Sequence, residues 1–159
     1  MLKEIKIKGY KSLKDVTLNL RPINILIGAN GVGKSNFITF FSLVNNIYEQ
    51  NLQSYSMTCG ADSLLYYGLK HTNQIEGSLD FGNNTYAFKL SPAKDGSLYI
   101  AEEENVYLNS NFIYPSKNIR ESKIKDSTRT RDSYLRDCLA SYRIYHFHDT
   151  EMSSKLRSK

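Results

Sequence analysis

The sequence lacks several features that would place it outside the ordinary folded domains. It has no tryptophan, three prolines and nine glycines in 159 residues, which excludes a collagen-like or low-complexity chain. It has no run of 18 apolar residues, so no membrane span is predicted, and its charged first ten residues lack the apolar core of a signal peptide. Cys59 and Cys138 are too few for a disulfide framework, and we expect a reduced, cytoplasmic setting.

Charge is divided unevenly along the chain, whose formal net charge is +5. Residues 1–115 hold ten basic and ten acidic side chains, whereas residues 116–159 hold eleven basic and six acidic ones. The surplus therefore lies in the C-terminal part. A basic tail can attract the phosphate backbone of DNA, but the interleaved acids also fit a solvated polar segment. From the sequence both interpretations stay open.

Apolar spacing predicts the elements of the first third of the chain. Period-two runs at Leu2–Ile7 and Leu13–Leu20 predict two strands joined by a turn. The nearly continuous apolar run Ile23–Ile27, which ends at a glycine, predicts a buried parallel strand. Apolar residues at spacings of three and four then predict a helix over Lys34–Tyr48. We therefore expect residues 1–50 to form three strands, a loop and a helix.

The rest of the chain returns to β signals. Alternating runs separated by Asn-rich and Asp-Gly turns predict an antiparallel β meander over 74–108. Within it, the acidic stretch Ile100–Glu104 is interpreted as a solvated strand edge. Residues 109–130 are polar and are expected to form a loop. Residues 131–159 are expected to hold a helix, a strand over 142–147 and a basic tail.

The strongest motif is a glycine-rich loop of the pattern G-x-x-x-x-G-K-S/T, with the sequence Gly28-Ala29-Asn30-Gly31-Val32-Gly33-Lys34-Ser35. Its glycines let backbone N–H groups converge on a phosphate without a Cβ in the way. The helix that follows adds its free N-terminal N–H groups and the positive end of its dipole. Lys34 would place a charge on the β- and γ-phosphates, and Ser35 would offer its hydroxyl to Mg²⁺. The alternative is a plain glycine turn between strand and helix.

Residues 1–45 resemble the N-terminus of ABC-type P-loop ATPases of the SMC/RecF kind. More narrowly, they resemble predicted bacterial AAA-type ATPases grouped with overcoming-lysogenization-defect (OLD-like) proteins. The matching stretches are Ile7–Asp15 and Ile23–Asn36, and Tyr145–Thr150 resembles a late segment of the same ATPases. The resemblance implies an α/β fold: the N-terminal lobe of an ABC-ATPase-like P-loop NTPase, with a mixed sheet and an antiparallel β layer.

The resemblance also implies which residues bind ATP and Mg²⁺. Lys11 or Ser12, in the first turn of the chain, would touch the base or the α-phosphate, although an ordinary hairpin turn is an equal alternative. Asn30 would reach the γ-phosphate side or shape the loop. Ser35 would hold the metal. The complete set of expected ligand contacts is Lys11, Ser12, Gly28, Asn30, Gly31, Val32, Gly33, Lys34, Ser35 and Asn36.

The sequence departs from that family after the P-loop. We find no ABC signature and no apolar strand ending in Asp-Glu, the Walker B element that supplies the catalytic carboxylate. We therefore expect an N-terminal lobe that ends before Walker B, contains no catalytic residues and alone hydrolyses ATP negligibly. The resemblance implies that the intact protein hydrolyses ATP as a homodimer, with ATP between two heads.

Other functions stay open from the sequence. The basic tail motivates a DNA-binding or protein-interaction module in which nucleotide is only a conformational ligand. The N/T-K-x-D sequence that reads guanine is absent, which disfavours GTP. His146 and His148 would share one face of a strand, which fits a strand end, a place near the γ-phosphate or part of a metal site. Heads of this kind serve DNA repair and phage defence, and the sequence does not distinguish these processes.

Overall fold

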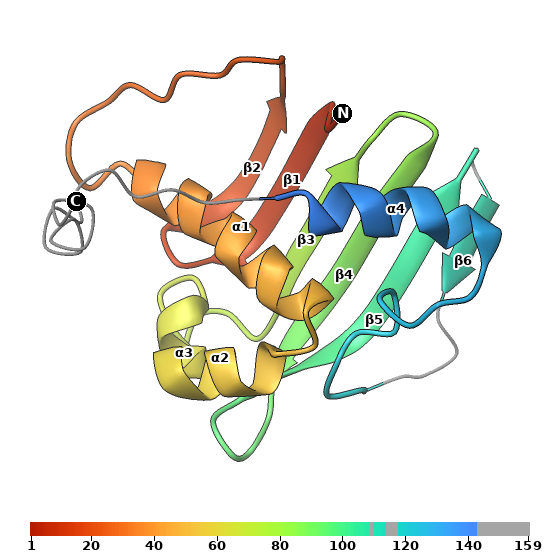
Figure 1. The fold of residues 1–159 in the computed structure, drawn as a ribbon. Coiled ribbons are helices and arrows are strands. Elements are labelled where there is room, and N and C mark those ends of the chain that lie inside the picture. Colours follow the sequence, from red (N-terminus) through yellow and green to blue (C-terminus); the bar gives the residue numbers. More distant parts are fainter. Residues whose placement is uncertain (109, 114–117, 143–159) are drawn as a thin grey trace, which may run out of the picture.

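The computed structural model describes residues 1–108, 110–113 and 118–142. Over this part the chain forms one twisted antiparallel sheet with helices packed against one face (Figure 1). The strand order is β2-β1-β3-β4-β5-β6. The strands span β1 Glu4–Tyr10, β2 Leu13–Asn19, β3 Ile75–Asp80, β4 Asn84–Pro92, β5 Leu98–Tyr107 and β6 Ser110–Ile113.

The described residues include four helices that lie on or beside this sheet. The long helices α1 and α4 cross the same face, and α2 and α3 follow the C-terminal end of α1 (Figure 1). The ranges are α1 Lys34–Tyr48, α2 Leu52–Cys59, α3 Ala61–Leu64 and α4 Thr130–Ala140. In the described part of the chain no helix is long and apolar enough to cross a membrane.

The core lies between α1 and the sheet. Phe40 of α1 stacks on Phe88 of β4, with ring centroids 6.1 Å apart. Phe88 in turn covers Gly77, its cross-strand partner on β3. A Cβ added to Gly77 would lie 2.3 Å from the ring of Phe88, so only glycine allows the ring to approach the sheet this closely. This contact sets the distance between α1 and the sheet.

The prediction of a parallel strand over Ile23–Ile27 is wrong for the described structure. These residues form no strand and are exposed. A strand needs a neighbour for its main-chain N–H and C=O groups, and no described residue pairs with this segment. The expected mixed sheet is corrected for the same reason, because every strand pair in the described part is antiparallel. The expected antiparallel β layer is present.

Two expectations about the later part also change. The polar segment 109–130 contains β6, which pairs with β5, and its residues 118–128 are held to the sheet and to the α1–α2 junction by side-chain bonds. Glu103, expected on a solvated edge, is fully buried, and its carboxylate accepts hydrogen bonds from Tyr86, Ser122 and the Lys123 N–H. The expected strand over 142–147 and the basic tail lie outside the described residues, apart from Tyr142.

Candidate nucleotide-binding site

The glycine-rich loop leads directly into α1, the helix that packs on the sheet. Two of its glycines have left-handed backbones, with φ of 86° at Gly31 and 101° at Gly33. Gly33 is the N-cap of α1. A Cβ on Gly33 would lie 3.0 Å from Ser12 Oγ and 3.1 Å from Leu13 Cδ2. Both its φ and its crowded surroundings therefore favour glycine at this position.

The N-terminus of α1 is left without a capping group. No side chain caps it, and its first turn contains no acidic residue. The first N–H groups of a helix have no intrahelical partner and carry the positive end of the helix dipole. The 15-residue helix α1 thus presents these N–H groups to an anion at the end of the glycine-rich loop.

Lys34 lies at the first position of α1 and reaches back over the loop. Its Nζ donates hydrogen bonds of 2.7 Å to the carbonyl oxygens of Gly28 and Ala29. Among the described residues it forms no ion pair with a carboxylate. An ammonium group bonded only to neutral carbonyls keeps its full charge for a phosphate.

The structure brings the turn between β1 and β2 against this helix. Asn36 Nδ2, in the first turn of α1, donates a 2.8 Å hydrogen bond to Ser12 Oγ. Lys11 has a left-handed φ of 48° and its Nζ lies 3.4 Å from Thr39 Oγ1. The hydroxyl of Tyr10 donates to the carbonyl oxygen of Thr39 at 3.2 Å. Ser12 and Asn36 are therefore in direct contact, and the neighbouring Lys11 contacts the same helix through Thr39.

A pocket of about 510 Å³ opens beside this turn. Lys11, Ser12 and Asn36 line one side, and residues of α3 and the turn after it line the other, including Asp62 and Tyr67. Tyr67 is 73% exposed, and its ring stands edge-on to that of Tyr66, with centroids 4.5 Å apart.

Sequence reasoning missed Asp62 and Tyr67. Neither residue belongs to a motif, so the sequence carries no signal for their place beside the pocket. Asp62 Oδ1 accepts a 2.8 Å hydrogen bond from the backbone N–H of Leu69 and so fixes this turn.

The remaining expected site residues lie in the open part of the loop. Asn30 and Val32 are exposed, and Ser35 is exposed in the first turn of α1. No three His, Cys, Asp or Glu side chains gather into a metal site anywhere in the described ranges. His146 and His148 lie outside those ranges.

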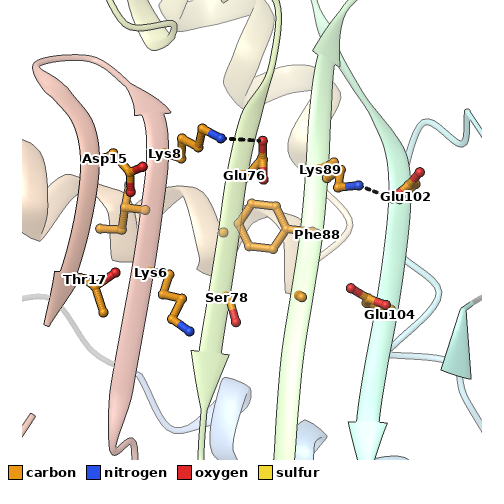
Figure 2. A pocket seen from close by; sticks show the side chains of 13 residues that line it. Lys6, Lys8, Asp15, Thr17, Glu76, Ser78, Phe88, Lys89, Glu102 and Glu104 are labelled. Carbon is orange, nitrogen blue, oxygen red and sulfur yellow. Dashed lines mark ion pairs between the residues drawn. The ribbon is translucent and has the colours of Figure 1, made fainter. Parts of the chain in front are cut away.

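A second hollow, of about 290 Å³, lies on the face of the sheet opposite the helices (Figure 2). A row of alternating charges crosses it from β2 to β5, in the order Asp15, Lys8, Glu76, Lys89 and Glu102. Lys8 and Glu76 are 3.6 Å apart and Lys89 and Glu102 are 2.6 Å apart. The row has three carboxylates and two lysines, so most of its charge is compensated within the sheet. This hollow lies apart from the glycine-rich loop.

Comparisons with known proteins show the family of the chain and its fold. A family model described as the AAA ATPase domain matches residues 1–157. A search of curated protein sequences finds no match. One similar solved structure comes from work on the ATP-driven dimerization and DNA-stimulated activation of SMC ATPases; it matches with a TM-score of 0.52 and 18% identity, over 99% of this chain and 92% of that chain. At this identity the likeness shows the fold. The family match covers nearly the whole chain, which therefore belongs to the AAA ATPase domain family.

Proposed function

We propose that this chain binds ATP with Mg²⁺ through the loop 28–36 and the N-terminus of α1. The family implies nucleotide binding, and the observation that carries the proposal is the uncapped N-terminus of α1 preceded by the left-handed Gly33. Phosphate oxygens are bound where several main-chain N–H groups converge beside a fixed positive charge. The loop supplies the main-chain N–H groups, and Lys34 supplies the positive charge.

Each residue of the loop has a role in this proposal. Main-chain N–H groups from Asn30 to Ser35 surround the phosphates, while Gly28 and Gly31 let the backbone approach them. Lys34 leaves its two carbonyl partners and bonds the β- and γ-phosphates. The hydroxyl of Ser35 is a hard oxygen ligand of the kind that Mg²⁺ prefers, and Mg²⁺ neutralises phosphate charge when it is bound. Asn36 holds Ser12 against the loop.

The nucleoside would enter the pocket beside the β1–β2 turn. Lys11 and Ser12 lie between this pocket and the start of α1, so a ligand held by the loop through its phosphates would extend toward them. The exposed ring of Tyr67 offers a stacking surface for a base, and base–aromatic stacking contributes about 1–3 kcal/mol. Asp62 lies at the same pocket as a hydrogen-bond acceptor.

Hydrolysis needs groups beyond the loop 28–36 in this proposal. Phosphoryl transfer to water needs a group that orients the water and charge that stabilises the transition state. The loop 28–36 contains Lys34 but no Asp or Glu that could do the first task. The chain alone would therefore turn ATP over negligibly, and two heads with ATP between them would complete the site.

Equilibrium binding of MgATP tests the proposal. Lys34→Ala is expected to weaken binding on the order of ten- to a hundredfold, because it removes a charge-assisted hydrogen bond. Lys94→Ala is the matched control, since Lys94 is exposed in the turn between β4 and β5. Equal affinities of the two variants would contradict the proposal. ATPase turnover by the wild-type chain that Lys34→Ala abolishes would show that a catalytic group was missed.

The charge surplus of residues 116–159 supports a second candidate, binding to DNA. Within the described part of that region, Arg120 pairs with Asp95 at 2.7 Å and Lys125 with Glu49 at 2.5 Å, which leaves less free charge than the composition suggests. Salt-dependent DNA binding that Lys34→Ala leaves unchanged would favour this candidate. Absence of DNA binding at low salt would remove it.

A further inference from the structure

A pocket of about 390 Å³ lies at the end of the sheet where β1 begins and the chain turns from β3 to β4 (Figure 1). Its lining consists of Lys3, Phe81, Asn83, Asn84, Tyr107 and Tyr134. Neither the loop 28–36 nor the pocket beside the β1–β2 turn shares a lining residue with it. The volume falls in the range of about 300–1,000 Å³ that is typical of small-molecule sites, so the pocket could hold a ligand of its own.

Asn84 is the buried polar side chain of this pocket. It is 6% exposed, and its Oδ1 accepts no hydrogen bond from any of the described residues. Its backbone is already fixed, because its carbonyl oxygen accepts a 2.8 Å hydrogen bond from the Phe81 N–H and the residue stands opposite Tyr107 on β5. A buried amide oxygen without a donor is costly and uncommon. This oxygen therefore points to a ligand that donates an N–H or O–H group.

Aromatic rings from three elements surround the same pocket. Phe81 and Tyr134 meet edge-on, with ring centroids 6.3 Å apart. Tyr107 and Tyr134 are 40% and 42% exposed, so part of each side chain is open to a ligand. Half-exposed rings at a pocket offer flat apolar surfaces on which a planar group can stack. The expected ligand therefore contains a ring.

The charge of the pocket is positive. Lys3 forms no ion pair within the part of the chain that the structure describes, and no Asp or Glu lines the pocket. Its ammonium group lies close over the hairpin, since a Cβ added to Gly82 would be 2.8 Å from Lys3 Nζ. An ammonium group without a carboxylate favours an anionic group on the ligand. A cationic ligand would find no carboxylate among the lining residues.

We propose that this pocket binds a free mononucleotide, at a site separate from the glycine-rich loop. The base stacks on the rings of Tyr107 and Tyr134, an N–H group at its edge donates to Asn84 Oδ1, and its phosphate pairs with Lys3. A nucleobase combines a flat ring with N–H donors at its edge, and the phosphate supplies the anion. A simple aromatic carboxylate would suit the rings and the ammonium group, but it has no N–H to offer Asn84. The proposal does not depend on ATP binding at the loop 28–36.

Titration of the labelled whole chain with guanosine 5′-monophosphate, followed by its amide signals, tests the site. We expect saturable binding with a dissociation constant below about 1 mM, and the largest shifts at Asn84, Tyr107 and Tyr134. Guanosine lacks the phosphate and ribose 5-phosphate lacks the base, so each is expected to bind at least about tenfold more weakly. A single-stranded oligonucleotide is expected to bind at these residues no more tightly than the mononucleotide.

Two variants test the named contacts. Lys3→Ala and Asn84→Ala are each expected to weaken binding of the mononucleotide about tenfold, because each removes one hydrogen-bonding group. Lys14→Ala, at an exposed position of β2, is the matched control for the lost charge and is expected to leave the affinity unchanged. Urea unfolding reports whether each variant is folded. If Asn84→Ala does not fold, Lys3→Ala still decides, because Lys3 is exposed.

Several results would overturn the proposal. One is the absence of saturable binding up to about 10 mM mononucleotide, and another is unchanged affinity in Lys3→Ala. Shifts confined to residues 31–35, or binding that Lys34→Ala abolishes, would place the mononucleotide in the glycine-rich loop instead. An oligonucleotide that binds at Asn84 and Tyr134 more tightly than the mononucleotide would contradict the assignment to a free nucleotide. Binding of MgATP is measured separately, so failure at either site leaves the other proposal standing.

Discussion

Ser12 accepts a hydrogen bond from Asn36 across 24 positions of sequence, and this bond joins the turn between β1 and β2 to the first turn of α1. The two parts of the candidate site, which the sequence presents separately, are therefore in direct contact. Because Gly33 packs against the same serine, a change at Ser12 reaches the glycine-rich loop as well. Because the bond joins Ser12 and Asn36, the effects of substituting these two residues on the affinity for MgATP should not add.

Ser12→Ala and Asn36→Ala are each expected to lower the affinity for MgATP by a factor of about 2–10, because each removes one hydrogen bond that orders the site. The double variant should bind MgATP with no lower affinity than the single variant that binds it more weakly. A double-mutant cycle measured by calorimetric titration checks this. Strictly additive losses would show that the two side chains act independently.

Gly33→Ala and Gly31→Ala separate backbone strain from crowding. Both glycines have positive φ, which costs a residue with a Cβ roughly 1–2 kcal/mol. Only at Gly33 would the new Cβ also meet neighbours, since nothing lies within 4 Å of a Cβ on Gly31. We expect Gly33→Ala to be the more destabilising variant in urea unfolding and the weaker ATP binder. An equal effect of both would leave backbone strain as the whole cause.

Gly77→Ala tests the contact that sets the spacing between α1 and the sheet. The added methyl would overlap the ring of Phe88, and overpacking of this kind costs about 1–3 kcal/mol. Phe88→Leu in the same chain should recover part of the loss. Ser78→Ala, the next residue on the other face of β3, is the control and should change the unfolding free energy little. If Phe88→Leu gives no recovery, the steric cause is wrong.

Glu103 gives the fold a defined dependence on pH. Burial raises the pKa of its carboxyl above the ordinary 4.5, although bonds from Ser122, Tyr86 and the Lys123 N–H oppose this and the nearby Asp132 adds to it. The folded state then binds the proton more tightly than the unfolded chain does. The contribution of Glu103 to stability therefore falls as pH rises from 4.5 through the raised pKa of the folded state.

Glu103→Gln removes this titration. As the pH is lowered toward 4.5, the unfolding free energy of the wild type should rise relative to that of the variant. Comparing the two proteins at each pH cancels the contribution of other carboxyls to the pH dependence. One of these is Asp95, whose pKa is lowered by bonds from Ser97 and Arg120. Denaturant unfolding from pH 7.5 to 4.5 measures the difference, and a difference independent of pH would refute the assignment to Glu103.

Local patterns predicted much of this fold. Spacings of three and four gave the range of α1, Lys34–Tyr48, and turn residues between alternating runs predicted β3, β4 and β5. Glu103 was misread because it stands between two other glutamates, and its burial depends on Tyr86 and Ser122, which come from distant parts of the chain. Periodicity cannot report such partners.

The candidate site was predicted unevenly for the same reason. A motif of consecutive residues fixes the loop 28–35, whereas the pocket beside it needs α3 and its turn to fold against the β1–β2 turn. Asp62 and Tyr67 belong to no motif, and the bond from the Lys11 N–H to the Leu64 carbonyl, 2.9 Å long, is one of the contacts that bring them near. The apolar run 23–27 predicted a buried strand, but in the described structure it is exposed and forms no strand.

The most direct test of the central claim is a magnetic-resonance titration of the labelled chain with MgATP. If the glycine-rich loop and the start of α1 bind the phosphates, the amide signals of Gly31, Gly33, Lys34 and Ser35 should shift most, and those around Lys11 and Tyr67 should follow. The same titration of Lys34→Ala should need far more ATP. Unmoved loop signals at saturating MgATP, or shifts confined to the charged sheet face around Glu76 and Lys89, would contradict the account.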